Sequence, residues 1–219
     1  MLGPVIDWDD EATRATYDVI ADAYADFFRS TEPEQPIDLA MIEHFKATLV
    51  SHPRVLDAGC GAGRMMPLLA ELGCRVEGVD LSPGMVRRAR TDHGEFKSQV
   101  ASLSALPFAA ATFDGVFMWY STIHGSDEEL GKMLAEANRV LTPEGSLLVA
   151  FQTGDGVREV GQGIRARGHN IQMMRYHRGV TEMDRALEHA GFRVTASLDR
   201  APVGSEEDGQ AVLIARRLC

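Results

Sequence analysis

The chain has 219 residues, 45% of them hydrophobic and 25% charged, which is the composition of a folded globular protein rather than a disordered one. Its formal net charge of −10, from 32 acidic and 22 basic residues, disfavours a nucleic-acid partner because such a surface repels phosphate groups. No apolar run approaches the roughly 20 residues that cross a bilayer, and the acidic first residues lack a signal-peptide core, so we expect a cytoplasmic location and no membrane partner.

Two helical segments come first, over about 10–29 and 37–50, and short apolar strands then alternate with helices. In chain order we predict strands at 54–58, 74–80, 95–101, 113–120 and 146–151, with helices at 63–72, 82–90 and 127–141 between them. A helix near 180–190 and strands at 191–197 and 210–217 follow. This alternation predicts an α/β fold with a parallel sheet covered on both faces, in which ligands bind at the carboxyl ends of the strands.

A glycine-rich loop follows the first strand, in the stretch VLDAGCGAGR at 55–64. Glycines at such a turn let a ligand lie directly against the backbone amides. The dinucleotide fingerprint G-x-G-x-x-G starting at Gly59 would need a third glycine at 64, where Arg64 stands, so an NAD-type pyrophosphate site is disfavoured. Asp57 adds a carboxylate beside the loop, which suits a ligand with a positive amino group better than one with two phosphates.

The second strand ends in Asp80. A carboxylate at this place in a nucleotide-binding α/β sheet accepts hydrogen bonds from ribose hydroxyls. Together with Asp57 and the glycine loop, Asp80 predicts a ligand that joins a ribose to a cationic amino acid group.

The segment VLDAGCGAGRMMPLLAELGCRVEGVDLSPGMVRRAR at 55–90 resembles the S-adenosylmethionine-binding region of class I methyltransferases. The resemblance continues through LPFAAATFDGVFMWYSTIHG at 106–125 and LAEANRVLTPEGSLLVAF at 134–151. It implies a single domain, a Rossmann-like three-layer αβα sandwich with a seven-stranded, mostly parallel sheet, whose antiparallel last strand would be QAVLIARR at 210–217. It also implies S-adenosyl-L-methionine as cofactor and S-adenosyl-L-homocysteine as product.

By position, the resemblance assigns cofactor contacts to three parts of the chain. Residues around the loop would lie along the methionine part, with the carboxylate behind the loop: Asp57, Gly59, Cys60 and Gly61. A second group would surround the ribose and the adenine: Asp80, Leu81, Met85, Ser102 and Leu103. The backbone of Met118 and Trp119 would face the amino group. The family commonly has Asp where Ser102 stands, so adenine recognition here would depend more on backbone amides.

The sequence after the fourth strand, WYSTIHG at 119–125, narrows the methyl acceptor. It lacks the [DN]-P-P-[YF] motif of base-amine methylation and an Asp cluster that would bind Mg²⁺. We therefore expect a direct, metal-independent displacement onto oxygen or nitrogen of a small molecule, with no metal site. The candidate catalytic residues are Tyr120 and His124; His124 is either a general base or a structural residue, and the sequence leaves both open.

Segments on both sides of the predicted cofactor core, 51–151, would close over the site. In the N-terminal lid, 1–50, Tyr17 and Tyr24 either reach the cofactor or pack on the sheet as one helix face. A variable acceptor cap would span 152–178, and 179–219 would complete the sheet. Cap residues expected over the acceptor are His169, Arg175, Tyr176 and His177, and a set of arginines could touch an anionic molecule: Arg165, Arg167, Arg175 and Arg178.

Two other functions stay open at this point. The chain could bind S-adenosylmethionine as a sensor or scaffold, since the loop and Asp80 predict binding rather than turnover. An NAD-dependent oxidoreductase is the weaker alternative because of Arg64. We expect a monomer or a homodimer that acts on a small-molecule partner.

Overall fold

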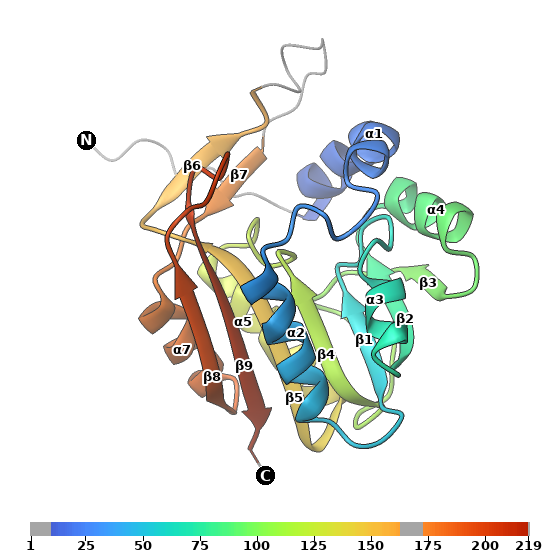
Figure 1. Cartoon of the computed structure of the whole chain (residues 1–219). Helices are drawn as coiled ribbons and strands as arrows, with labels where there is room; N and C mark the ends of the chain where they lie inside the picture. The colour runs from blue at the N-terminus through green and yellow to red at the C-terminus, as the bar shows by residue number, and fades with distance from the viewer. Residues whose placement is uncertain (1–9, 163–172, 219) are drawn as a thin grey trace.

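The computed structural model describes residues 10–162 and 173–218. The expected cap residues Arg165, Arg167 and His169 therefore lie outside the described residues. A seven-stranded sheet with helices on both faces forms the body of the described chain, and a short two-stranded sheet stands beside it (Figure 1). Among the described helices, none is long and apolar enough to cross a membrane.

The large sheet has the strand order β3-β2-β1-β4-β5-β9-β8. Its strands are β1 (Arg54–Ala58), β2 (Arg75–Asp80), β3 (Lys97–Val100), β4 (Phe113–Trp119), β5 (Leu141–Thr153), β8 (Phe192–Arg200) and β9 (Gly209–Arg217). The first five pair in parallel, whereas β9 pairs antiparallel with both β5 and β8. The predicted mostly parallel sheet with an antiparallel last strand is confirmed. Strand order reverses between β1 and β4, which is where open α/β sheets bind ligands.

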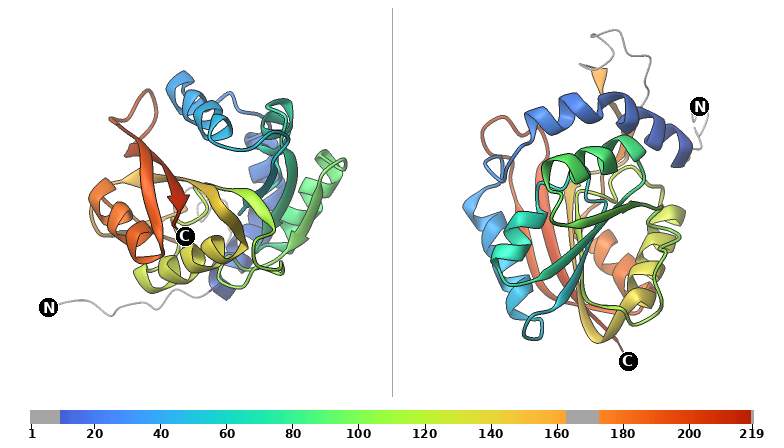
Figure 2. Two further views of the ribbon diagram at one scale, coloured as in Figure 1. Left: turned by 90° about the horizontal axis from the view of Figure 1, so that it is seen from below. Right: turned by 90° about the vertical axis from the view of Figure 1, so that its right-hand side faces the viewer.

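Helices cover the sheet on two sides, as Figure 2 shows from below and from the side. α2 (Pro36–Ala47) and α3 (Met66–Glu71) lie on one face, and α5 (Asp127–Val140) and α7 (Val180–His189) lie on the other. α1 (Asp10–Phe27) lies above the carboxyl ends of the strands and packs against α4 (Pro83–Asp92). α1 is therefore placed over the edge at which a ligand would enter.

The strands carry apolar side chains on both faces because both faces are covered. Leu56 and Val116 belong to the core cluster that contains α5 and α7 residues, while Val55 and Phe117 belong to the cluster beneath α2 and α3. Alternate residues of a strand point to opposite faces, which explains the division. Two carboxylates, Asp57 and Asp80, lie near the carboxyl ends of β1 and β2.

Three local features differ from the sequence prediction. α3 begins at Met66 rather than at 63, because Gly63 has φ +87°, a left-handed conformation that a right-handed helix does not contain. β5 begins at Leu141, and its pairing with β4 is irregular around Glu144, whose φ is +62°. The expected cap contains an antiparallel hairpin, β6 (Val157–Val160) and β7 (Met173–Tyr176), which the sequence pattern did not predict.

Candidate active site at the carboxyl ends of the strands

The glycine loop turns sharply between β1 and α3. Gly59 and Gly61 have φ of +83° and +55°, in the left-handed region that side chains disfavour. A Cβ at Gly59 would lie 2.2 Å from the Cβ of Ser121, so the loop packs directly on the segment after β4. A Cβ at Gly61 would meet nothing within 4 Å, because Gly61 lies on a cavity. One glycine allows close packing, and the other leaves bare backbone toward a ligand.

Asp80, at the carboxyl end of β2, is bound to the loop by backbone hydrogen bonds. Its Oδ2 accepts from the amide of Gly61 at 2.8 Å, and its Oδ1 accepts from the amide of Ser82 at 2.9 Å. Burial raises the pKa of Asp80 to about 6, and the two amide bonds act against that rise. A carboxylate has about four acceptor positions, so Asp80 keeps two for a ligand in the cavity.

Asp57 lies in β1 behind the loop, and only 1% of its surface is exposed. Within the described chain its Oδ2 has no hydrogen-bond partner. Burial, and then the charge of Asp80, raises the pKa of Asp57 to about 7. A buried and a half-buried carboxylate on one cavity favour a cationic ligand group, because a positive charge offsets the cost of removing them from water.

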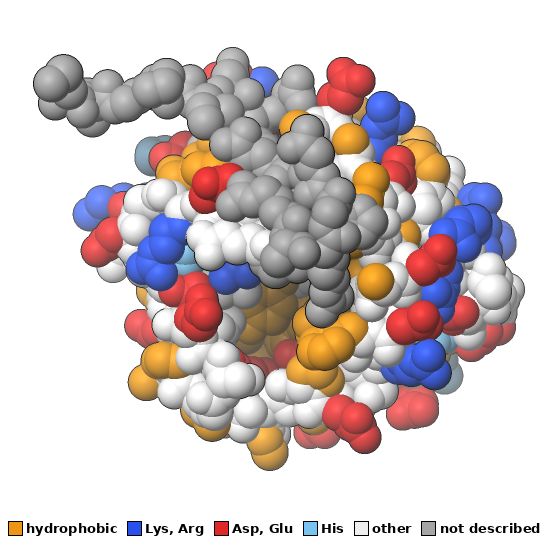
Figure 3. Space-filling view, turned by 90° about the horizontal axis from the view of Figure 1, so that it is seen from above, with side chains coloured by type: hydrophobic (Ala, Val, Ile, Leu, Met, Phe, Trp, Pro, Cys, Tyr) orange, Lys and Arg blue, Asp and Glu red, His pale blue; other side chains and the backbone are white. Residues whose placement is uncertain are grey.

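A cavity of about 700 Å³ opens at the carboxyl ends of the strands, a size in the usual range of small-molecule sites. Seen from above in Figure 3, the surface is hollowed, and hydrophobic side chains are visible inside the hollow. Most of the predicted site residues line the cavity: Tyr17, Tyr24, Asp57, Gly59, Cys60, Gly61, Asp80, Leu81, Met85, Ser102, Leu103, Trp119, Tyr120 and His124. Met118 does not, because it points to the opposite face of β4 from Trp119 and is fully buried in the core beside α5.

Several buried polar atoms on the cavity wall lack a hydrogen-bond partner among the described residues. They are Asp57 Oδ2, Trp119 Nε1, Ser121 Oγ, Gln152 Oε1 and Arg175 Nε. Folded proteins leave few buried polar atoms unpaired, since each one costs about 1–3 kcal/mol. Their collection around one cavity indicates a polar ligand. Because the set includes both donors and acceptors, that ligand must offer both as well.

An acidic stripe holds α1 against α4. Asp18 accepts hydrogen bonds from Oγ of Ser82 at 2.5 Å and from the amide of Gly84 at 2.8 Å, which places a carboxylate at the N-terminus of α4. The next two aspartates of the stripe, four and eight residues further on, both pair with Arg88. Residues four apart share one helix face, so the spacing D-x-x-x-D-x-x-x-D at 18–26 is the sequence signal for this docking.

The cavity side of α1 carries Tyr17, whose hydroxyl is 2.8 Å from Nε2 of His124. The other ring nitrogen, Nδ1, lies 2.5 Å from the carbonyl oxygen of Met174 on β7. A carbonyl only accepts, so Nδ1 carries the proton and Nε2 accepts from Tyr17. Burial lowers the pKa of His124 to about 4, which makes the imidazole neutral at pH 7. This hydrogen-bonded chain connects α1, the segment after β4 and the β6–β7 hairpin.

Two further tyrosines line the cavity. Tyr24 lies edge-on to Tyr17, with ring centroids 6.1 Å apart. Tyr120 follows β4 directly and has φ +56°, an uncommon conformation for a bulky residue. Its ring packs edge-on against Trp119, and burial raises the pKa of its hydroxyl. Backbone strain of this kind collects at functional sites, which supports Tyr120 as a site residue.

Arg64, which stands in place of a third glycine, forms a largely buried ion pair. Its Nη1 lies 2.6 Å from Oε1 of Glu34, in the connection between α1 and α2. The guanidinium also lies over the ring of Phe28, 5.8 Å from the centroid. Arg64 therefore attaches the glycine loop to the segment that follows α1. No local pattern links the two partners, and the sequence did not predict this role.

Cys60 fills space beside the loop. Its side chain is buried, its Sγ is 3.6 Å from the carbonyl oxygen of Gly61, and burial raises the pKa of the thiol. Such a thiol is a poor nucleophile. Within residues 10–162 and 173–218, no three His, Cys, Asp or Glu side chains gather as metal ligands would.

The described cap residues divide between two cavities. Arg175 lines the cavity of the glycine loop, whereas Tyr176, His177 and Arg178 line a second cavity of about 600 Å³ beside α5 and α7. Arg178 pairs there with Asp127, the first residue of α5, at 3.0 Å. The predicted placement over the acceptor is therefore wrong for Tyr176 and His177, and Arg178 does not share a cavity with Arg175. Adjacent strand residues point to opposite faces, which separates Arg175 from Tyr176.

Comparison with known proteins decides the family. A family model described as a methyltransferase domain matches residues 55–145, which contain the glycine loop, Asp80 and the end of β4. Together with the methyltransferases described below, this match indicates a class I S-adenosylmethionine-dependent methyltransferase. The predicted family is thereby confirmed, and S-adenosylmethionine is the cofactor of that family.

Curated methyltransferases resemble this family member over different lengths. A malonyl-[acyl-carrier protein] O-methyltransferase of Enterobacter lignolyticus is 34% identical over 113 residues, which cover 52% of this chain and 44% of the relative. The O-methyltransferase resE of Aspergillus sclerotiorum is 27% identical over 203 residues, covering 87% of this chain and 76% of the relative. The chain spans less than half the length of the malonyl enzyme that it matches.

Solved structures share the fold of this methyltransferase. The 1,6-didemethyltoxoflavin-N1-methyltransferase of Burkholderia thailandensis has a TM-score of 0.67 and 22% identity, with 100% of this chain and 94% of that chain covered. That structure contains 1,6-didemethyltoxoflavin and S-adenosylhomocysteine. At this identity, the likeness establishes a common Rossmann-like methyltransferase fold.

Proposed function

We propose that this methyltransferase moves a methyl group from S-adenosylmethionine to an oxygen or nitrogen atom of a small molecule by direct displacement, without a metal. The observation that carries the proposal is one cavity on which a buried and a half-buried carboxylate, bare glycine backbone and buried polar atoms without a partner in the described chain meet. The names of the relatives are consistent with transfer to either oxygen or nitrogen, since two are O-methyltransferases and one is an N1-methyltransferase. The lid, core and cap boundaries, the cytoplasmic location and the monomeric or homodimeric state stay predictions.

The cavity fits the cofactor at its sugar, its amino acid part and its base. Asp80 keeps two acceptor positions, which suits the two hydroxyls of a ribose. Asp57 has an unpaired carboxylate oxygen, which suits a positively charged amino group. Leu81 and Met85 give the cavity an apolar wall for the adenine, with Ser102 at its edge. When bound, the cofactor supplies a methyl group on a positively charged sulfur, which leaves as a neutral thioether.

The residues beyond the glycine loop have the task of holding the acceptor in line with that methyl group. Positioning of this kind lowers a reaction barrier by about 7–11 kcal/mol. We assign it to Tyr17, Tyr120 and His124, which come to one cavity from α1 and the segment after β4. His124 can act as a base only after giving up a hydrogen bond, because both of its ring nitrogens are engaged.

A labelled-methyl assay tests the proposal. The protein is incubated with methyl-labelled S-adenosylmethionine and a metabolite extract, with and without EDTA, and the products are separated by mass spectrometry. We expect labelled small molecules, an equal amount of S-adenosylhomocysteine, and no effect of EDTA. Binding of S-adenosylhomocysteine without any labelled product contradicts the proposal and supports a sensor or scaffold instead. Loss of activity in EDTA contradicts the metal-independent mechanism.

A further inference from the structure

On the basis of the proposed methyl transfer, we infer the chemical class of the acceptor: it is a carboxylate that Arg175 binds and that receives the methyl group on oxygen, giving a methyl ester. The inference depends on an excess of positive charge at one end of the cavity, on an unpaired donor of Arg175, and on the bonding state of His124.

The β6–β7 hairpin places two arginines around one aspartate. Arg158 and Arg175 face each other across the hairpin, and like charges in such a position repel unless an anion neutralises them. Asp208, just before β9, lies 2.7 Å from Arg158 and 3.2 Å from Arg175, and it also accepts from Nε2 of His177 at 3.0 Å. Burial alone would raise the pKa of Asp208, but these three partners bring it below its ordinary value. Two permanent cations thus share one carboxylate, which leaves one positive charge in excess.

Arg175 is the cation of this cluster on the cavity wall. Its Nε is buried and has no hydrogen-bond partner in the described part of the chain, whereas the side chain of Arg158 is 58% exposed. Arg175 lines the same cavity as Tyr17 and His124, and its charge acts to lower the pKa of both. An anion bound there would pair with the Nε–H group and neutralise the excess charge.

A second charged network lies beside the cavity, around Arg200. Glu206 pairs with Arg200 at 2.6 Å, and Asp38 pairs with the same guanidinium at 2.6 Å. The charges of this network act on the pKa of Tyr120, whereas those of Asp80 and Arg175 act on Tyr17. Tyr17 thus lies near one acidic and one basic group, and Arg175 is the basic group that an acceptor carboxylate would meet there.

A carboxylate acceptor also fits the hydrogen bonds of His124, which leave no ring nitrogen free to act as a base. Both ring nitrogens are engaged, and burial lowers the pKa of His124 to about 4, so the imidazole is a weak base. A hydroxyl or an ammonium group must lose a proton to attack, whereas a carboxylate is already an anion. Its oxygen supplies the electron pair for the new carbon–oxygen bond, the carbon–sulfur bond breaks with its pair left on sulfur, and no proton moves.

Treatment with alkali tests the product class whichever molecule the acceptor is. Mild base releases the methyl group of an ester as methanol but leaves methyl ethers and N-methyl groups intact. The labelled products of the extract assay are treated with base, and volatile labelled methanol is counted. We expect most of the transferred label to become volatile. Label that resists base overturns the carboxylate inference and leaves the proposed function standing, whereas binding of S-adenosylhomocysteine with no transfer at all contradicts the proposed function.

Binding to variants tests the role of Arg175 independently of turnover. Phenylacetate and phenylacetamide are titrated calorimetrically into the protein saturated with S-adenosylhomocysteine. We expect phenylacetate to bind better than phenylacetamide. Arg175→Gln should weaken the binding of phenylacetate by about 10- to 100-fold, as for a lost charge-assisted hydrogen bond. Arg175→Lys keeps the positive charge and should lose less affinity for phenylacetate.

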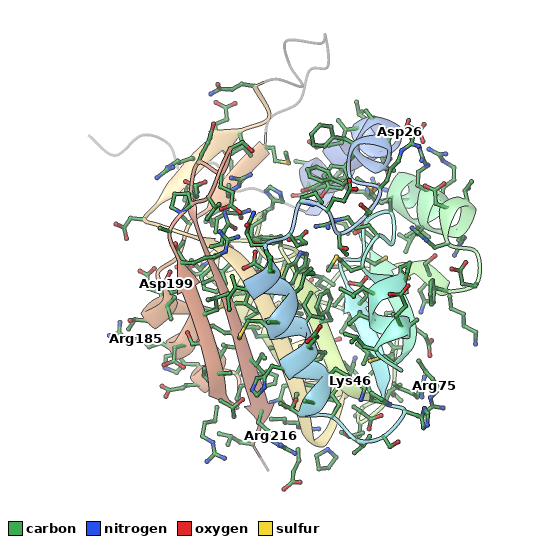
Figure 4. The ribbon with its side chains drawn as sticks, viewed as in Figure 1. Asp26, Lys46, Arg75, Arg185, Asp199 and Arg216 are labelled. Atoms are coloured by element: carbon green, nitrogen blue, oxygen red, sulfur yellow. The ribbon has the colours of Figure 1, made fainter. Side chains whose placement is uncertain are left out.

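Arg216→Gln is the matched control, because Arg216 lies at the end of the sheet away from α1 (Figure 4). All three variants should keep the wild-type melting temperature and affinity for S-adenosylhomocysteine, which separates a binding defect from misfolding. An acid that binds no better than the amide, or equally well to wild type and Arg175→Gln, overturns the inference.

Discussion

The two ends of the cavity are built in different ways. The end that we assign to the cofactor, called the cofactor end, comes mainly from one continuous stretch, β1 to α4, in which residues 57–85 supply both carboxylates and the glycine loop. The acceptor end comes from α1, the segment after β4, β7 and the approach to β9, which are far apart in the chain. Close packing and burial fix the first, as the 2.2 Å approach at Gly59 shows, whereas hydrogen bonds and ion pairs between distant segments, such as Tyr17 with His124 and Arg175 with Asp208, hold the second.

Because the two ends are built differently, substitutions in them should have different effects on stability and on turnover. Substitutions that disturb the close packing at the cofactor end should cost stability together with cofactor binding. Substitutions at the acceptor end remove one contact between surface segments, so they should change turnover or local mobility and leave the fold intact. The following predictions test the comparison from the largest expected effect to the smallest.

Gly59→Ala should be the most damaging single change. It adds a Cβ 2.2 Å from Ser121 and forces alanine to φ +83°, which together cost about 2–5 kcal/mol. For a domain of this size the melting temperature should fall by about 5–15 °C. Gly61→Ala is the matched control, since its Cβ would meet nothing within 4 Å and would project into the cavity. It should lose cofactor affinity more than stability, and equal melting temperatures for the two variants would contradict the assigned packing.

Asp57→Asn should change how stability depends on pH. The folded protein has a pKa of about 7 at Asp57 against an ordinary value of 3.8, so between those pH values the folded state holds a proton that the unfolded chain has lost. Wild-type stability therefore falls as pH rises through this window. Asparagine does not titrate. As the pH rises from 5 to 8, the difference in unfolding free energy between the two proteins should therefore shift by about 2–3 kcal/mol in favour of the variant, measured by urea unfolding. If the stability of Asp57→Asn depended on pH as that of the wild type does, the carboxyl group of Asp57 would not be the group that titrates in this range.

Tyr17→Phe should have the smallest effect on stability, about 1 kcal/mol, because it removes one hydrogen bond to His124. Hydrogen exchange should become faster in residues 10–27, and turnover should fall, since α1 loses its bond to the segment after β4. Tyr24→Phe is the control, because it removes a cavity hydroxyl without breaking that bond. If hydrogen exchange in α1 were identical in the two variants, the hydrogen bond between Tyr17 and His124 would not be what holds α1 in place.

The cofactor end could be predicted from the sequence because its residues follow from local rules. A glycine loop after a strand and an aspartate at the end of the next strand come together whenever adjacent parallel strands share an edge, as Gly61 and Asp80 do at 2.8 Å. Met118 marks the limit of this reasoning. Its side chain turns into the core on the face opposite Trp119, and the predicted contact of its backbone with the cofactor stays a prediction.

The acceptor end could not be predicted, because its contacts join segments that no short pattern connects. The pairs Arg64 with Glu34 and Arg175 with Asp208 depend on how α1 and the β6–β7 hairpin fold back over the sheet. The hairpin itself lies in a stretch rich in Gly and Arg, without the alternation that predicts strands. Tertiary placement, rather than local sequence, decides which of these side chains reach the cavity.

Calorimetric titration of S-adenosylhomocysteine into wild type, Asp80→Asn and Asp199→Asn tests most directly whether the cavity holds the cofactor through the carboxylate of β2. Asp199 is exposed on β8 and serves as the control. We predict binding to wild type, an affinity about 10- to 100-fold weaker for Asp80→Asn, and no change for Asp199→Asn, with all three proteins folded. Absence of binding to wild type, or equal affinity of wild type and Asp80→Asn, would contradict the account.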